Sequence, residues 1–254
     1  MEICGPLSRP RGNLCGRGAC VRARIMPKTG RVGTICGATR RHHRSMSPGP
    51  AALVPPDPAW GEQAVELLAV VRSAFAVLDG AQGMVYDHIG STAVPGLAAK
   101  PFLDLQVRVP VLLPVEEWTR ALGTTTFRPA QGSRPDSPGV TFDLPRGSTG
   151  RDDENLWRKS LFVSAAPAAI LHIRRADSPW AAYTVALRDL LLEDSRRRGQ
   201  YEDLKRRLAR EHADDGDYDD YTRAKTVFFD EVQDEMEDRV RAARGASVRS
   251  EPGR

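Results

Sequence analysis

Residues 102–109 alternate between two kinds of side chain, with Leu and Val at every second position, a pattern that predicts a β-strand with one face buried in a core. The leucine and valine side chains share the buried face, so Asp104 and Gln106 both project from the opposite face. This segment favours an α/β fold in which Asp104 lies on one strand of a small mixed sheet, with helices before and after it.

Hydrophobic periodicity predicts the remaining elements. A second strand is expected over residues 85–89, and a hairpin over residues 156–164 and 169–174. Residues 131–150 are dense in Pro, Gly, Ser and Asp and are expected to form a long loop. Helices are expected at residues 58–78, 116–122, 180–192, 200–212 and 221–243. The apolar stripe of the first is predicted to comprise Val65, Leu68, Ala69, Val71 and Phe75. The last three helices are predicted to form a C-terminal layer.

Basic charge is concentrated at the N-terminal end of the chain. The formal net charge is +4, but residues 1–50 hold nine Arg and one Lys against the single acid Glu2. The remaining residues are therefore net negative, which makes nucleic-acid binding by the folded domain an unfavoured function. Binding through the basic tail stays a separate hypothesis.

The four cysteines, Cys4, Cys15, Cys20 and Cys36, also lie in this N-terminal segment. A disulfide framework in the folded domain is therefore excluded. Cys15 and Cys20 lack the CxxC spacing and a matching downstream pair, although two histidines at 42 and 43 leave a zinc site as an alternative.

Composition divides the chain into three parts. Residues 1–50 are rich in Arg, Gly and Ser and are expected to be a disordered tail, or alternatively an artefact of start-site choice, since Met26 or Met46 would also initiate the domain. Residues 51–242 are expected to form the domain, and residues 243–254 a second tail. No run approaches the roughly eighteen apolar residues of a membrane helix, and no apolar segment follows the basic N-terminus. We therefore expect a cytoplasmic protein without a membrane partner.

A glycine-serine turn between the two predicted strands is the main candidate for chemistry. Gly90 and Ser91 leave a strand in a way that lets backbone N–H groups and a hydroxyl converge on a phosphate. Asp104, on the following strand, is placed to bind a divalent cation, and Lys100 to neutralise phosphate charge. The alternative is that the turn only reverses the chain and that Asp104 is a solvated strand residue.

Residues 88–107 resemble the signature of the GrpB family, in which a His-Ile-Gly-Ser-Thr turn and a Pro-Gly-Leu-Ala-Lys-Pro segment precede an Asp-x-Asp strand. The resemblance covers everything but the N-terminal tail. Its other matched segments are residues 58–60, 157–159, 171–173, 187–189 and 221–226.

The resemblance implies a nucleotidyltransferase-like fold that binds a nucleoside triphosphate, with magnesium-dependent nucleotidyl transfer to an unidentified acceptor. It implies catalytic roles for Asp104 and His172, and magnesium ligands at Asp104 and Gln106. The phosphate-binding residues that it implies are Gly90, Ser91, Lys100, Lys159, Arg188 and Lys225. For His172 a structural role in its strand is the alternative, and for Arg188 an ion pair with Asp189 or Glu193 on a helix surface.

Two departures from the family pattern bear on activity. Gln106 replaces the second carboxylate of the Asp-x-Asp pair, and Ile170 stands where the family often has His or Asn. An amide is a weaker ligand for Mg²⁺ than a carboxylate. A transferase and a non-catalytic nucleotide-binding or interaction domain therefore both stay open. A GrpB-like domain is also fused to some dephospho-coenzyme A kinases, but the chain contains no GxxxxGK[ST] phosphate loop that would support coenzyme A chemistry.

Overall fold

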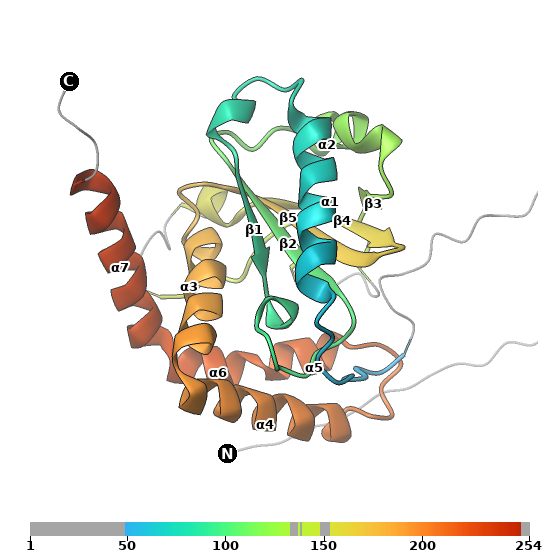
Figure 1. Ribbon diagram of the computed structural model, residues 1–254, viewed down its shortest axis with the longest axis vertical. Helices are drawn as coiled ribbons and strands as arrows, with labels where there is room; N and C mark the ends of the chain where they lie inside the picture. The colour runs from blue at the N-terminus through green and yellow to red at the C-terminus, as the bar shows by residue number, and fades with distance from the viewer. Residues whose placement is uncertain (1–48, 133–136, 138, 148–152, 250–254) are drawn as a thin grey trace, which may run out of the picture. The chain divides into compact units, whose positions relative to one another are not determined.

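The computed structural model describes residues 49–132, 137, 139–147 and 153–249 (Figure 1). Every described residue belongs to the unit formed by residues 43–254. The predictions for the N-terminal tail, including its cysteines, therefore fall outside the described residues.

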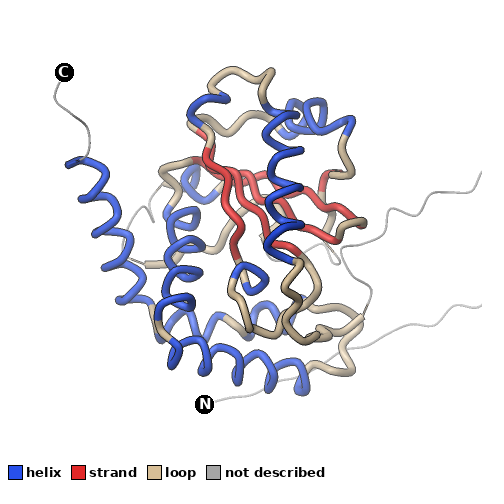
Figure 2. The backbone as a smooth tube through the Cα atoms, in the orientation of Figure 1, coloured by secondary structure: helices blue, strands red, loops and turns tan. Residues whose placement is uncertain are grey.

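A five-stranded mixed sheet forms the centre of the described unit (Figure 2). Its strands are β1 (Val85–Ile89), β2 (Leu103–Val109), β3 (Arg128–Pro129), β4 (Lys159–Ala165) and β5 (Ala168–Arg175). Their order is β1-β2-β5-β4-β3; β2 and β5 run parallel, and the other neighbouring pairs are antiparallel. The predicted α/β class, the first two strands and the hairpin are confirmed.

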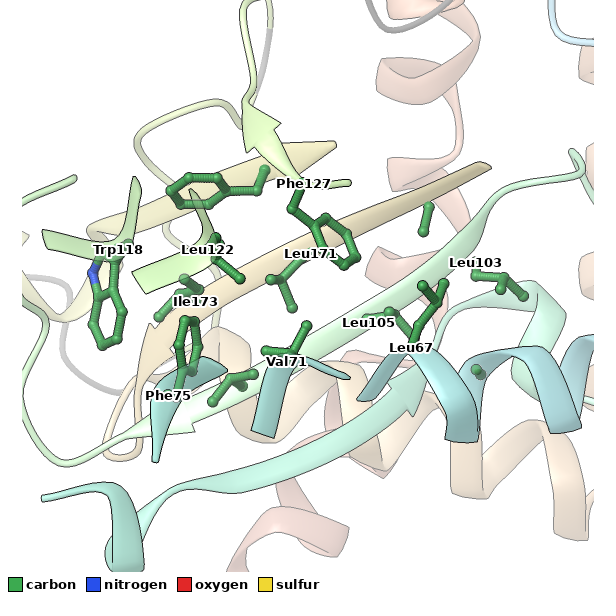
Figure 3. Packing of buried hydrophobic residues seen from close by; sticks show 14 of the residues in the cluster. Leu67, Val71, Phe75, Leu103, Leu105, Trp118, Leu122, Phe127, Leu171 and Ile173 are labelled. Atoms are coloured by element: carbon green, nitrogen blue, oxygen red, sulfur yellow. The ribbon is translucent and has the colours of Figure 1, made fainter. Parts of the chain in front are cut away.

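One face of the sheet carries the main hydrophobic core. Helices α1 (Trp60–Phe75) and α2 (Val115–Ala121) supply the covering side chains. In Figure 3, Leu105 of β2 and Leu171 and Ile173 of β5 meet Val71 and Phe75 of α1. The alternation of β2 thus places its apolar side chains in this core, as predicted.

The predicted stripe of α1 is partly wrong. Its buried residues are Trp60, Ala64, Leu67, Val71 and Phe75. Val65 is 67% exposed, because the stripe that begins at Trp60 turns position 65 toward solvent. Apolar residues on both sides of this helix made its buried face ambiguous from the sequence.

Five helices follow the sheet. They are α3 (Pro179–Glu193), α4 (Ser195–Glu211), α5 (Asp219–Ala224), α6 (Thr226–Glu231) and α7 (Gln233–Arg249). Helix α3 packs on β1, and its Ala181 carbonyl accepts a hydrogen bond from Gln106, so this layer covers the polar face of the sheet. Short 3₁₀ helices occupy Ala81–Gly83, Ser91–Ala93, Leu122–Thr124 and Glu154–Trp157. No helix of the described residues is both long and apolar enough to cross a membrane.

The single helix predicted over residues 221–243 is wrong, because α5, α6 and α7 occupy this segment. The breaks fall at Lys225 and Val232, and α7 leaves α6 at a steep angle (Figure 1). The bends keep Tyr221, Phe228 and Val232 in one buried cluster with α3 and α4. Helix α7 continues to Arg249, beyond the domain limit expected at residue 242.

Candidate ligand-binding site

A cavity of about 310 Å³ opens at the polar face of the sheet. Its walls come from the Gly90 turn, from β2, β4 and β5, from residues 139–146, and from helices α3 to α6. Seven lysine and arginine side chains line it against three aspartates, so the cavity is electropositive although the folded part of the chain is net acidic. Such a cavity favours an anionic ligand.

The Gly90 turn approaches Asp104 so closely that only glycine fits. Gly90 has φ 72°, a left-handed conformation that other residues rarely adopt. A Cβ atom added at this position would overlap Asp104 Oδ2. The glycine of the turn therefore fixes where the Asp104 carboxylate lies.

Replacing Gly90 with Ala is expected to lower the free energy of unfolding by about 1 to 3 kcal/mol, because the new side chain is strained and displaces Asp104. Urea denaturation measures the change. Gly61→Ala is the matched control, since a Cβ there meets open space in the first turn of α1 and is expected to be neutral or slightly stabilising. Equal stability of the two variants would contradict the expected constraint at Gly90.

His172 connects Asp104 to a buried ion network. Its Nδ1 lies 3.1 Å from Arg174 Nη2, and a guanidinium only donates, so Nδ1 accepts and Nε2 carries the hydrogen. Nε2 lies 3.9 Å from Asp104 Oδ1. Burial, together with the charges of Arg174 and Lys159, lowers the pKa of His172 to about 4, so the imidazole is neutral near pH 7.

Asp104 is held in its ionised form by its surroundings. Burial opposes its charge, but the polar Nε2–H of His172 and the positive charges of Lys225 and Lys100 outweigh burial and lower the pKa of Asp104. Its side chain is 34% exposed, because it faces the open cavity.

Asp143 joins two buried cations behind His172. It accepts from Arg174 Nε at 2.6 Å and from Lys159 Nζ at 2.8 Å. All three side chains are at least nine-tenths buried. Arg174 and Lys159 outweigh the effect of burial and hold the pKa of Asp143 far below its usual range. This network gives the wall of the cavity a fixed set of charges.

Gln106 belongs to the same network and is fully buried. Its Oε1 accepts hydrogen bonds from Arg174 Nη1 at 2.9 Å and Thr184 Oγ1 at 3.0 Å. Its Nε2 donates to the Ala181 carbonyl at 3.1 Å. The amide oxygen that a metal would need is therefore already engaged. Within the residues that the structure describes, no group of three or more His, Cys, Asp or Glu side chains is placed to hold a metal ion.

Lys205 of α4 lies at the Gly-Ser turn. Its Nζ donates to Ser91 Oγ at 3.1 Å and to the Ala98 carbonyl. The side chain is 1% exposed, and burial together with the charge of Lys225 lowers its pKa to about 7. A lysine that carries its positive charge below about pH 7 is thus built into the turn where a phosphate group is expected.

Lys100 and Lys225 complete the cationic wall. The Nζ of Lys100 lies 3.5 Å from the ring centre of Tyr218, and that of Lys225 lies 5.1 Å from the ring centre of Tyr221. Among the described residues, neither ammonium group has a hydrogen-bond acceptor. Burial and the charge of Lys225 lower the pKa of Lys100 to about 7.

The structure brings most of the expected site residues together. The cavity is lined by Gly90, Ser91, Lys100, Asp104, Lys159, His172 and Lys225. Arg188 is not among the lining residues. It donates to Asp189 and to the His88 carbonyl, so it forms the ion pair with Asp189 that was the alternative to phosphate binding. Gln106 lies behind the lining. Their proposed ligand roles stay predictions.

Three site residues were missed from the sequence. Arg174 follows His172 by two positions on the same strand, so strand alternation was a usable signal for it. Lys205 and Asp143 carry no comparable signal, because one lies in a basic helix and the other in a loop.

Comparison with known protein families identifies the family of this chain. The family model described as GrpB protein matches residues 50–235, which is most of the chain. The chain belongs to the GrpB family. The cavity lies almost wholly inside the matched residues.

This chain is similar in sequence to two curated proteins and in structure to a third protein. The dephospho-CoA kinase of Mycolicibacterium paratuberculosis is 31% identical over 196 residues, which are 73% of this chain and 46% of that protein. The glutamate-rich protein GrpB of Alkalihalophilus pseudofirmus is 28% identical over 166 residues, 65% of this chain and 86% of that protein. The chain thus spans about half the length of the dephospho-CoA kinase that it matches.

The crystal structure of the conserved protein GrpB from Enterococcus faecalis matches with a TM-score of 0.52 at 19% identity. The match covers 76% of this chain and 99% of that protein. At this identity the likeness shows the fold, and it is consistent with the expected nucleotidyltransferase-like α/β arrangement.

Proposed function

We propose that this GrpB domain binds a nucleotide through its phosphate groups in the electropositive cavity. The observation that carries the proposal is the pair Lys100 and Lys225. Each presents an ammonium group to the cavity and packs on a tyrosine ring, and none of the described residues accepts a hydrogen bond from either. Both lysines are half-buried, and charges that are partly removed from water are ordinarily paired, so these two groups favour an anion supplied by a ligand.

The rest of the lining supports a ligand with an apolar or aromatic part. Leu187, Trp180, Tyr201 and Phe229 line the cavity together with the charged wall. A nucleotide combines a charged phosphate end with a flat base that such side chains can contact. The volume of about 310 Å³ lies at the lower end of the range for small-molecule sites.

Magnesium-dependent nucleotidyl transfer is the second candidate, and it comes from the family resemblance. A magnesium site in a nucleotide-binding protein is commonly built on one or two carboxylates plus the substrate phosphates. Here Asp104 is the one carboxylate beside the Gly-Ser turn among the described residues, and the paired position is the engaged amide of Gln106. This donor set fits a two-carboxylate metal site poorly, so the proposal is limited to binding. The kinase activity named for the Mycolicibacterium relative is not carried over.

Titration calorimetry of the full chain against ATP, GTP, CTP, UTP and AMP tests the proposal. At least one nucleotide is expected to bind, and Lys225→Met is expected to weaken its affinity about tenfold or more, because a charge-assisted hydrogen bond contributes about 1.5 to 3 kcal/mol. Arg188→Met removes a cation outside the cavity and is expected to bind as the wild type does. Circular dichroism checks that both variants fold.

Two outcomes would contradict this proposal. The first is the absence of binding by all five nucleotides. The second is an equal loss of affinity in the Lys225 and Arg188 variants, which would mean that general surface charge attracts the nucleotide and that the cavity has no particular role.

A further inference from the structure

We infer that the cavity takes its phosphate-bearing ligand as a metal-free anion, and that Asp104 is the internal counterion of the cavity lysines. The inference rests on the proposed function, because it specifies how the same cavity holds a phosphate. It assigns to Asp104 a role opposite to the magnesium ligand that the family resemblance implies.

The first argument is the geometry beside Asp104. On the sheet face that carries Asp104, the neighbouring polar positions hold Gln106 and, on β5, His172 and Arg174. Arg174 donates to both Gln106 and Asp143, and it also approaches His172 Nδ1. The guanidinium of Arg174 therefore holds the Gln106 oxygen that would have to serve as the second metal ligand. Placing a divalent cation there requires this buried network to break.

The second argument is the distribution of charge around Asp104. One of its oxygens faces His172, and the other abuts the backbone at Gly90. Its negative charge acts on four lysines from four separate elements, namely Lys100, Lys159, Lys205 and Lys225. Lys159 is already paired with Asp143, and Asp219 and Glu202 also act on Lys100 and Lys205, but the lysine and arginine side chains of the lining still outnumber its aspartates by seven to three. Adding Mg²⁺ increases the local positive charge, whereas adding a phosphate reduces it.

The third argument is the contact made by Lys205. Its ammonium group already bonds to the hydroxyl of the Gly-Ser turn and to the Ala98 carbonyl. The positive charge that a metal ion would bring to a phosphate at this turn is thus present as a protein side chain. Together with Lys100 and Lys225, which also line the cavity, Lys205 supplies what positioning and charge neutralisation of a phosphate require.

Calorimetry of the full chain with ATP and AMP, in excess EDTA and in saturating MgCl₂, tests the inference. Binding in EDTA is expected to be at least as tight as in MgCl₂, since chelation by Mg²⁺ competes with the lysines for the phosphates. Binding that occurs only with Mg²⁺, or is about tenfold tighter with it, would overturn the inference and leave the proposed function standing. No binding in either condition would refute both.

An Asp104→Asn variant separates the two roles by the sign of its effect. As a counterion, Asp104 repels the incoming phosphate, so its replacement by a residue of equal size is expected to tighten ATP binding in EDTA by about threefold or more. As a magnesium ligand, its loss would weaken binding, and that result would overturn the inference. The titration is run about one pH unit below the pKa of Lys100, so that the lysines are charged. Asp189→Asn removes a carboxylate outside the cavity and is expected to leave the affinity unchanged.

Discussion

Asp143→Asn is expected to lower the free energy of unfolding by about 3 to 5 kcal/mol, because it leaves two buried cations without their counterion. Arg174 is 1% exposed and Lys159 is 7% exposed, and both bond directly to the Asp143 carboxylate. Neither can reach water without disrupting β4 or β5. An amide keeps the size of the side chain and removes its charge, so the loss reports on the ion network itself.

Urea denaturation followed by circular dichroism measures this loss. Asp177→Asn is the matched control, since Asp177 pairs with the neighbouring Arg175 at the surface and is 56% exposed. Exposed pairs contribute about 1 kcal/mol or less, so the control is expected to change little. A loss below about 1 kcal/mol for Asp143→Asn would contradict a network that depends on this carboxylate.

The second large effect is expected at Lys100, where stability and binding should change in opposite directions. Lys100→Met removes a desolvated ammonium that has no acceptor among the described residues, and it is expected to stabilise the ligand-free protein by about 1 to 2 kcal/mol. The same change is expected to weaken nucleotide binding about tenfold or more, because an anion loses one of its cationic partners. Destabilisation with unchanged affinity would contradict both expectations.

The pH dependence of unfolding gives an independent measure of Lys100. Its pKa is about 7 in the folded protein, against 10.5 for a lysine in an unfolded chain, so between these values the unfolded chain holds more protons. Stability that is set by this group therefore rises as pH increases from about 7 toward 10. Lys205, whose pKa is also about 7, contributes in the same direction. The rise is expected to be smaller in Lys100→Met than in the wild type, and an equal rise would contradict the lowered pKa.

The sheet could be predicted because its signals are local. The alternation of residues 102–109 identified β2 and its buried face, and β1 was predicted at residues 85–89. The helix predicted over residues 221–243 was wrong, because its breaks at Lys225 and Val232 depend on packing against α3 and α4. The segment contains no Gly or Pro that would have indicated a break.

The residues of the candidate site that lie in family motifs were predicted. The charged residues that are far apart in the sequence and become neighbours only in the folded protein were missed. Gly90, Asp104 and His172 were found through motifs and line the cavity. Lys205 bonds to Ser91 across 114 residues of sequence, and Asp143 bonds to Arg174 across 31. Single-sequence periodicity carries no information on such long-range pairs. By contrast, the alternative for Arg188 could be stated from the sequence, since its partner Asp189 is the next residue.

The position of Lys205 and Lys225 on the C-terminal helices has a consequence for when the site exists. The turn at Gly90 and the strand that bears Asp104 are synthesised long before α4 and α5, and until those helices pack, the turn has a carboxylate but lacks two of its cations. A partly folded chain would therefore have Lys100 beside this carboxylate but lack Lys205 and Lys225, and its turn would be less electropositive than that of the complete domain. The proposed phosphate site is therefore complete only in the finished tertiary structure, and a ligand that binds there is expected to stabilise chains whose last helices have docked.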